Sequence, residues 1–259
     1  MSSLFDLTGK VALITGSSRG IGRAIAEAMA QHGASVVVSS RKAEACEQVA
    51  QHINHQLCAD GPGRAIVVPC NISSKPELEN LVQETERQLG RIDILVCNAA
   101  VNPFFGPSAQ IPDSAFNKIL QCNLTANHWL TQMVAPTMAE RGDGVIILIS
   151  SIGGVHGSST LGAYAISKAA DMQLARNLAV EYGASNVRAN AIAPGLIQTD
   201  FARALWENPD ILAASTAHTP LKRIGQPDEI SGAAVFLASR AGQFMTGQTL
   251  VIDGGTTIA

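Results

Sequence analysis

The segment that decides the fold is Val11-Ala-Leu-Ile-Thr15-Gly16-Ser-Ser-Arg-Gly20-Ile-Gly22. Its first half is a continuous apolar run, which is typical of a strand buried on both faces of a parallel sheet. Its glycines follow a G-x-x-x-G-x-G spacing, after which helical periodicity begins. Such a turn directs backbone N–H groups and a helix N-terminus toward an anion, and glycine allows close approach. The segment predicts a pyrophosphate-binding turn; the alternative is a turn that only packs a helix onto a sheet.

Short apolar runs alternate with longer amphipathic segments along the rest of the chain. Strands are predicted at Val11–Thr15, Ser35–Ser40, Ala65–Cys70, Ile92–Asn98, Val145–Ser150, Val187–Ala193 and Thr249–Ile252. Helices are predicted at about Arg23–Gln31, Lys42–Leu57, Pro76–Gly90, Ser114–Gln121, Leu124–Glu140, Ala163–Glu181 and Asp228–Ser239. This alternation implies right-handed crossovers and a doubly wound parallel sheet of about seven strands with helices on both faces. Without a linker, repeat or low-complexity tract, residues 1–259 are predicted to form a single Rossmann-type α/β domain.

The composition describes a globular, rather apolar chain. Hydrophobic residues make up 46% of the 259 residues, charged residues make up 15%, and the net charge is −3. Because there is no long run of like charge, neither nucleic acid nor an acidic membrane surface is predicted as a partner. No apolar stretch approaches the roughly 20 residues of a membrane span. Met1–Lys10 also lacks the basic-then-apolar pattern of a signal peptide.

The five cysteines contain no C-x-x-C pair. They are interpreted as free thiols in a reducing compartment, so a cytoplasmic location is predicted. One spacing, His52, His55 and Cys58, invites a metal hypothesis. Steps of three residues drift around a helix, however, and no fourth ligand lies nearby in the sequence. We therefore predict an ordinary polar helix face and no metal site.

The second functional signal is Tyr164-Ala-Ile-Ser-Lys168, inside a predicted helix. Residues four apart lie on one face of a helix, so the phenol and the ammonium can converge. A tyrosine with its usual pKa of about 10 is a poor base at neutral pH, but a nearby ammonium favours the phenolate. The pair is a candidate general acid/base for protonating an alkoxide or deprotonating an alcohol. Taken alone, this spacing is more often just a helix face.

Together, these segments resemble the short-chain dehydrogenase/reductase family over nearly the whole chain. The family's glycine motif matches Thr15–Gly22, and its Asn-Ala-Gly element matches Asn98-Ala99-Ala100. Its four catalytic residues match Asn123 (followed by Leu124), Ser151 after the fifth strand, and the Tyr-x-x-x-Lys pair Tyr164 and Lys168. Its Pro-Gly step matches Pro194-Gly195. Two residues depart from the pattern. Ala100 replaces the usual glycine, and Asn71 stands where an aspartate often contacts adenine.

The resemblance implies a role for each catalytic residue. In the reductive direction, negative charge develops on the carbonyl oxygen, to which Ser151 donates a hydrogen bond and Tyr164 a proton. Lys168 stabilises the phenolate and holds the nicotinamide ribose, and Asn123 fixes a water that relays protons to Lys168. The alternatives are a strand-end hydroxyl for Ser151 and a helix N-cap for Asn123. The implied cofactor contacts are Gly16, Ser18, Arg19, Gly20, Ile21, Gly22, Ser40, Arg41, Asn71, Ile72, Asn98, Ala99, Tyr164, Lys168, Pro194, Gly195, Ile197 and Thr199.

The end of the second strand bears on the choice of cofactor. A protein that selects NAD usually carries an acidic side chain there, which binds the ribose hydroxyls. Here the strand ends Val38-Ser39-Ser40-Arg41-Lys42, without a carboxylate. Ser40, Arg41 and Arg19 are instead suited to a 2′-phosphate, because a guanidinium binds phosphate oxygens in pairs. NADP(H) is the predicted cofactor; the alternative is that Arg41 and Lys42 only begin a solvated helix.

The stretch Asn98–Gly106 resembles the branch that contains NADPH-dependent carbonyl and retinal reductases. By the same resemblance, the substrate lies among the segment after Asn98, the loop between Ser151 and Tyr164, and a flap at about residues 196–215. Phe104, Phe105, His156, Phe201, Leu205 and Trp206 are candidate wall residues, which favours an apolar carbonyl compound. These side chains could equally pack on the sheet or line a subunit interface.

Two other functions remain open at the level of sequence: reduction of 3-oxoacyl thioesters on an acyl carrier protein, and non-catalytic sensing of a dinucleotide. A homo-oligomer, specifically a tetramer, is predicted because Leu124–Glu140 and Ala163–Glu181 carry apolar residues on more than one face.

Overall fold

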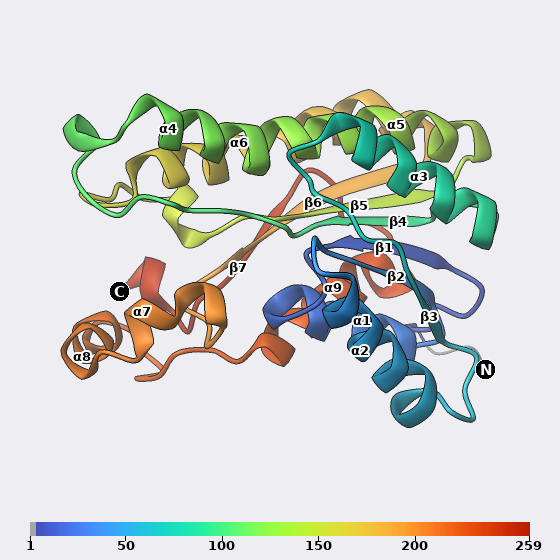
Figure 1. Cartoon of the computed structure of the whole chain (residues 1–259), viewed down its shortest axis with the longest axis horizontal. Coiled ribbons are helices and arrows are strands. Elements are labelled where there is room, and N and C mark those ends of the chain that lie inside the picture. Colours follow the sequence, from blue (N-terminus) through green and yellow to red (C-terminus); the bar gives the residue numbers. More distant parts are fainter. Residues whose placement is uncertain (1–3) are drawn as a thin grey trace.

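Seven parallel strands form one sheet, in the order β3-β2-β1-β4-β5-β6-β7 (Figure 1). This computed structural model describes residues 4–259. Residues 1–3, which belong to the predicted domain 1–259 and to the stretch Met1–Lys10, lie outside the described part. The strands are β1 (Val11–Thr15), β2 (Ser35–Ser39), β3 (Arg64–Val67), β4 (Ile94–Cys97), β5 (Gly144–Ile149), β6 (Val187–Pro194) and β7 (Thr249–Ile252). The predicted doubly wound α/β sheet is therefore confirmed.

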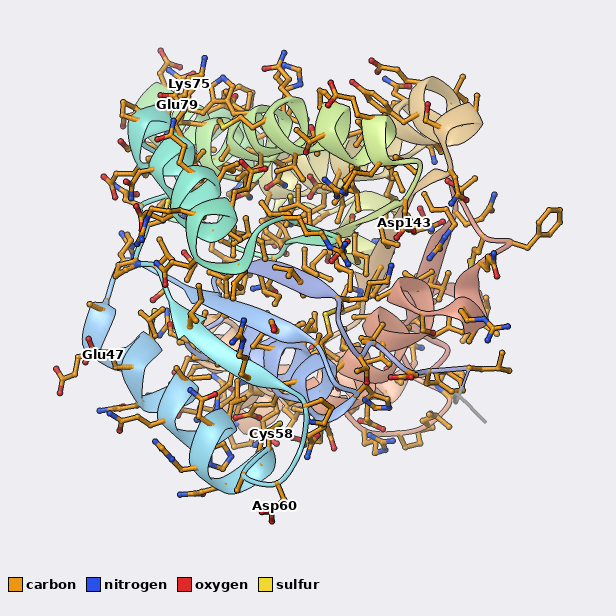
Figure 2. All side chains as sticks on the ribbon, turned by 90° about the vertical axis from the view of Figure 1, so that its right-hand side faces the viewer. Glu47, Cys58, Asp60, Lys75, Glu79 and Asp143 are labelled. Carbon is orange, nitrogen blue, oxygen red and sulfur yellow. The ribbon has the colours of Figure 1, made fainter. Side chains whose placement is uncertain are left out.

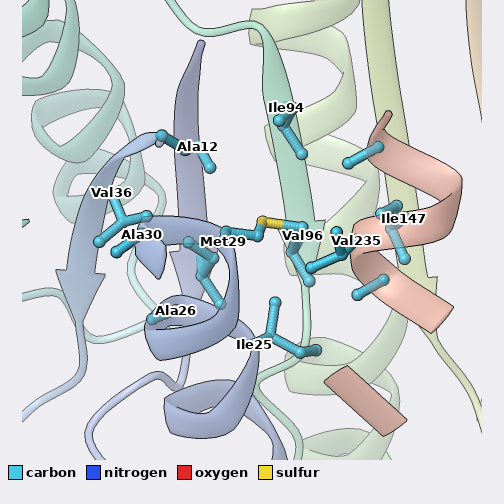
Figure 3. Close-up of a cluster of buried hydrophobic side chains, with 14 of the residues drawn as sticks. Ala12, Ile25, Ala26, Met29, Ala30, Val36, Ile94, Val96, Ile147 and Val235 are labelled. Carbon is cyan, nitrogen blue, oxygen red and sulfur yellow. The ribbon is translucent and has the colours of Figure 1, made fainter. Parts of the chain in front are cut away.

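Two layers of helices cover the sheet (Figure 1). One layer contains α1 (Gly20–Gln31), α2 (Ala43–His52) and α9 (Pro227–Ala238); the other contains α3 (Lys75–Leu89), α4 (Asp113–Leu120), α5 (Ala126–Arg141) and α6 (Gly162–Tyr182). Each layer closes over its own apolar cluster. Figure 3 shows part of the first cluster, in which Met29 of α1 lies between Val36 and Val96 of the sheet. Burial on both faces explains the continuous apolar runs of β1, β4 and β5.

The chain reverses its direction of winding between β1 and β4. These strands are neighbours in the sheet, with Ala12, Leu13 and Ile14 paired to Ile94, Leu95 and Val96. The chain leaves β1 toward β2 and β3, whereas it leaves β4 toward β5, β6 and β7. In open α/β sheets a crevice forms beyond the carboxyl ends of strands at such a switch point, and ligands bind there.

The segment after β6 forms short helices beside the carboxyl terminus (Figure 1). A 3₁₀ turn (Asp200–Ala202), α7 (Arg203–Trp206) and α8 (Pro209–Ala217) follow one another, and none of them contains a buried residue. The predicted flap at about 196–215 thus contains these short, weakly packed helices, whereas Ile197 near its start is buried in the first apolar cluster.

Two π-helical turns were not expected from the sequence. Ile53–Leu57 continues α2, and Gln121–Thr125 joins α4 to α5. The two helices predicted at Ser114–Gln121 and Leu124–Glu140 are therefore one helical rod. Apolar periodicity records which residues face the core, and it does not distinguish a π turn from a break.

The His52, His55 and Cys58 spacing does not build a metal site. His52 Nδ1 lies 2.8 Å from Gln56 Oε1, and the Cys58 side chain is buried near the end of the helix, where Asp60 points outward (Figure 2). Among residues 4–259, no group of three or more His, Cys, Asp or Glu side chains is arranged to hold a metal ion. Within the same residues, no helix is long and apolar enough to cross a membrane. All five cysteines are buried and unpaired with one another.

Gly22 is expected to be the least replaceable residue at the start of α1. A Cβ there would lie 2.4 Å from Asn98 Nδ2 and 2.5 Å from Gly16 O. Gly22→Ala should lower the melting temperature by roughly 5 °C, because overpacking of this kind costs about 1–3 kcal/mol. Gly232→Ala in α9 is the control. Its Cβ meets nothing within 4 Å, and alanine is the better helix former, so it should be neutral or stabilising. Equal melting temperatures for the two variants would contradict the prediction.

Candidate active site

The glycine turn after β1 has the geometry of a phosphate cradle. Gly16 and Gly20 adopt φ values of +66° and +56°, in the left-handed region that favours glycine. Helix α1 starts at Gly20, with Ser18 and Arg19 directly before it and Ile21 in its first turn. A Cβ on Gly16 or Gly22 would collide with Asn98, so these glycines let the turn pack closely against the end of β4. The turn fits the diphosphate of a dinucleotide at a helix N-terminus.

Asn98, after β4, holds this turn in place. Its Nδ2 donates hydrogen bonds to Thr15 O at 2.9 Å and to Gly16 O at 3.1 Å. The backbone N–H groups of Asn98 and Ala99 both donate to Thr15 Oγ1 at 3.1 Å. Asn98, which the sequence predicts to contact the cofactor, therefore also fixes the shape of the glycine turn. This second role was not predicted from the sequence.

The end of β2 presents cations without a carboxylate. Ser17 Oγ accepts a hydrogen bond from Ser39 N at 2.9 Å, which joins the glycine turn to this strand. Ser40 Oγ lies 3.1 Å from Cys46 Sγ, and Arg41 is exposed. Within residues 4–259, Arg41 has no ion pair. The guanidinium of Arg19 is 68% exposed and lies 3.5 Å from the carboxylate of Asp200, a contact that links the turn to the segment after β6.

Tyr164 and Lys168 lie on one face of α6, as their spacing predicts. Lys168 Nζ is 5.7 Å from the centroid of the Tyr164 ring, and the lysine side chain is only 2% exposed. Nζ donates a hydrogen bond to Ile149 O, at the carboxyl end of β5, at 2.8 Å. Ser151 follows that strand, and its Oγ accepts a hydrogen bond from Gly153 N at 3.0 Å. The strand end and the helix thus bring the serine, tyrosine and lysine to one region.

Asn123 is not a helix N-cap, because it lies inside the π-helical turn between α4 and α5. Its Oδ1 accepts a hydrogen bond from Val101 N at 2.8 Å, and its Nδ2 donates to Val101 O and to Ser167 Oγ. The side chain therefore ties the segment after β4 to α6. Its fully buried position places it one helix turn from Asn127 and next to the lysine-bearing helix.

Asp171 is a charged residue of the site that the sequence analysis missed. Its carboxylate lies 3.1 Å from Lys168 Nζ and is fully buried. Burial alone would lower the pKa of Lys168, but the charges of Asp171 and Tyr164 outweigh it and hold that pKa above its usual value. Burial raises the pKa of the Asp171 carboxyl, while Lys168 and Asn127 favour its charged form. The i,i+3 spacing places Asp171 near Lys168 on the same helix and could have been recognised in the sequence. The sequence does not show that both side chains are buried.

The remaining positions assigned to the cofactor lie on both sides of the switch point. Asn71 Oδ1 accepts a hydrogen bond from Ser73 N, and Ile72 packs against the apolar cluster beneath α3. Pro194 ends β6, a Cβ on Gly195 would meet Asp253, and Ile197 is buried. Thr199 Cγ2 would lie 3.2 Å from a Cβ on Gly20, so Thr199 borders the glycine turn.

A small cavity lies beside Tyr164. The segment after β4 and the loop before α6 line it through Asn102, Phe104, Gly106, Ser108, Ile111, Ile119, Thr160, Leu161, Gly162, Ala163 and Tyr164. The Phe201 ring lies 6.0 Å from the Tyr164 ring. Phe105 is 61% exposed and His156 is exposed, so neither forms part of this cavity. The walls combine apolar side chains such as Phe104 and Ile119 with polar ones such as Asn102 and Thr160.

Comparison with known proteins agrees with this geometry. The family model described as Enoyl-(Acyl carrier protein) reductase matches residues 16–257. Dehydrogenase/reductase SDR family member 4 of Bos taurus is 42% identical over 251 residues, covering 96% of this chain and 88% of that protein.

Solved structures of similar proteins include complexes with NADH and with NADP. A 7 alpha-hydroxysteroid dehydrogenase complexed with NADH and 7-oxo glycochenodeoxycholic acid superposes with a TM-score of 0.91, 40% identity and coverage of 97% and 95% of the two chains. A gluconate 5-dehydrogenase from Burkholderia cenocepacia J2315 in complex with NADP and tartrate superposes with a TM-score of 0.92, 34% identity and 98% coverage of both chains.

The chain belongs to the short-chain dehydrogenase/reductase family. It is an oxidoreductase that acts on alcohol or carbonyl groups with a nicotinamide cofactor.

Proposed function

We propose that the protein is an NADP(H)-dependent carbonyl reductase, or alcohol dehydrogenase in reverse, that uses Tyr164, Lys168, Ser151 and Asn123. The observation that carries the proposal is the buried Lys168 ammonium 5.7 Å from the Tyr164 ring at the end of β5. An ammonium in that position favours the phenolate and so helps a tyrosine exchange protons. The intact set of polar side chains argues against a protein that only senses a dinucleotide.

The nicotinamide cofactor, when bound, supplies or accepts the hydride. The Ser151 hydroxyl donates a hydrogen bond to the carbonyl oxygen and stabilises the negative charge that develops there. Tyr164 donates the proton that completes the alcohol and receives it in the reverse direction. Lys168 stabilises the resulting phenolate and binds the nicotinamide ribose. Asn123 fixes the helix junction beside them and holds the water of the proton relay.

Tyr164→Phe should abolish turnover while leaving cofactor binding nearly intact. Phenylalanine keeps the ring contacts but has no proton to give, and loss of general acid catalysis should cost on the order of 10²–10⁴ in rate. The measurement is kcat on a panel of ketones and aldehydes, with cofactor affinity measured separately by fluorescence titration. An unchanged kcat in this variant would remove Tyr164 from the mechanism.

The proposed preference for NADP(H) rests on the cations around the end of β2. The related structures hold either NADH or NADP, so the preference of this chain depends on its own residues. Ser40 and Arg41 directly follow β2 and Arg19 lies in the glycine turn, and in this proposal the three residues bind the 2′-phosphate. Arginine suits this task because its planar fork binds phosphate oxygens in pairs and remains charged.

Arg41→Asp should sharply lower the use of NADPH and spare or improve that of NADH. One charge-assisted contact is worth about 10-fold in kcat/KM, so the wild-type protein should prefer NADPH by about that factor or more. Steady-state kinetics with both cofactors provide the measurement. Arg87→Asp, at an exposed position of α3, is the matched charge reversal and should leave the ratio unchanged. Equal efficiency with both cofactors in the wild type would contradict the proposed phosphate site.

The proposed substrate is an apolar carbonyl compound, because apolar side chains form part of the walls of the cavity beside Tyr164. The second candidate is reduction of the 3-oxo group of an acyl thioester on an acyl carrier protein. The description of the matching family model names that carrier, but the enoyl group it names is reduced at a carbon–carbon double bond and not at a ketone. An acidic carrier protein would require a basic surface beside the flap. Residues 196–215 instead contain Arg203 against Asp200, Glu207 and Asp210, and Arg203 pairs with two of these. Activity on free ketones but not on acyl thioesters would separate the two functions.

The protein should be a homotetramer in solution. Ile166 and Val180 of α6 are 56% and 86% exposed, and a partner subunit packed on α5 and α6 would cover them. Sedimentation velocity at micromolar concentration should therefore give about four times the mass of one chain. An active monomer at that concentration would count against this assembly.

A cytoplasmic location fits the five unpaired thiols.

A further inference from the structure

The interior of α6 holds a charged pair of which only the lysine takes part in the proposed reaction. Lys168 Nζ lies 3.1 Å from Asp171 Oδ2, and the two side chains are 2% and 0% exposed. Isolated charges are costly in a protein interior, so a buried carboxylate requires partners. A carboxylate placed against the lysine of the site therefore affects how that lysine acts.

A hydrogen-bonded network surrounds this pair. Asn127 of α5 is buried, and its Nδ2 donates to Asp171 Oδ1 at 2.9 Å and to Asn123 O at 2.7 Å. Lys168 Nζ also donates to Ile149 O at 2.8 Å. A direct path through protein groups therefore joins Asn123 to Lys168 by way of Asn127 and Asp171.

We propose that Asp171 is a positioning residue, and that its carboxylate sets the pH at which Tyr164-dependent turnover is lost. The inference rests on the proposed function, because it requires Tyr164 to exchange the proton. Asp171 acts through Lys168, which it orients and whose charge it offsets.

The orienting effect follows from the number of donors on Lys168. An ammonium has three N–H donors. One is engaged by Ile149 O and one by Asp171 Oδ2, which leaves one to be directed toward the ribose and Tyr164. A lysine held at two points loses little further freedom when it binds a cofactor.

The second effect is electrostatic. The Lys168 ammonium favours the phenolate of Tyr164, and a carboxylate 3.1 Å from Nζ opposes that influence. The other titratable groups that face the pair are Tyr164 of α6 and Cys97 of β4. Burial and the charge of Asp171 raise the pKa of the Cys97 thiol, so it remains neutral. From α5 and β5 come the uncharged Asn127 amide and Ile149 carbonyl, and Asp171 therefore provides the opposing negative charge.

The test is Asp171→Asn, measured in the direction of carbonyl reduction with NADPH over the pH range in which both proteins stay folded. Reduction needs a protonated phenol and a charged lysine. Without the carboxylate, the ammonium acts on the phenol unopposed, and the buried lysine loses its own proton more readily. Both changes move the alkaline limb of the pH–rate profile to lower pH, by on the order of one pH unit. The loss should appear mainly in kcat, because Asp171 lines neither the cavity nor the glycine turn.

Three control variants separate charge from structure. Glu181→Gln removes an exposed negative charge at the far end of α6 and should leave the profile unchanged. Asn127→Ala breaks the same network without altering its charge, so it should lower thermal stability but leave the alkaline limb in place. Asp171→Glu retains the charge and should keep the limb near its wild-type position. Asp171→Ser is a second charge-removing variant, whose smaller side chain leaves room for water.

An alkaline limb unmoved in Asp171→Asn and Asp171→Ser would overturn the inference, as would an equal displacement in Asn127→Ala. Failure of both charge-removing variants to fold, with Asp171→Glu folded and active, would show that the carboxylate serves folding and would also overturn it. Absence of Tyr164-dependent turnover in the wild-type protein is a different result, because it refutes the proposed function itself.

Discussion

The architecture depends on a group of hydrogen bonds where β1 and β4 end side by side. Thr15 Oγ1 accepts from two backbone N–H groups after β4, and Asn98 Nδ2 donates to the carbonyls of Thr15, the last residue of β1, and of Gly16. The pairing of the two strands ends at Ile14 and Val96, and beyond it the chain turns away from them in opposite directions. Cross-linking by one hydroxyl and one amide keeps the glycine turn open and fixes its distance from the opposite half of the site.

The sheet was predictable because β1, β4 and β5 are continuous apolar runs, and the predicted ranges Val11–Thr15 and Thr249–Ile252 are the observed ones. The predicted end of a strand was less accurate where buried residues continue beyond the last residue that pairs with a neighbouring strand. Val68 and Cys70 are buried beyond the end of β3, so their apolar character marks contact with the core rather than membership of the strand. Sequence patterns report the environment of a side chain more directly than the hydrogen bonds of its backbone.

The site was predictable where chemistry fixes spacing along one element, as for Tyr164 and Lys168 on α6. It was not predictable where the contact joins separate elements. The Asp171 carboxylate meets Lys168 on its own helix but Asn127 on α5, and only the packing of α5 on α6 makes all three fully buried. Similarly, Arg19 was expected to face a phosphate, and its ion pair with Asp200 depends on how the segment after β6 folds back over the glycine turn.

The π-helical turn at Gln121–Thr125 sets the rotational phase of the helical rod. A π segment accommodates one residue more than an α-helix of the same length, which rotates everything beyond it by about 100°. Ile119, before the turn, lines the cavity beside Tyr164, whereas Asn127, after it, faces Asp171. The single additional residue thus lets one rod present Ile119 to the cavity beside Tyr164 and the Asn127 amide to a buried charge. Deleting that residue would rotate Asn127 relative to Ile119, so the two side chains could no longer face Asp171 and the cavity at the same time. This would happen even though no residue that contacts Asp171 or lines the cavity had changed.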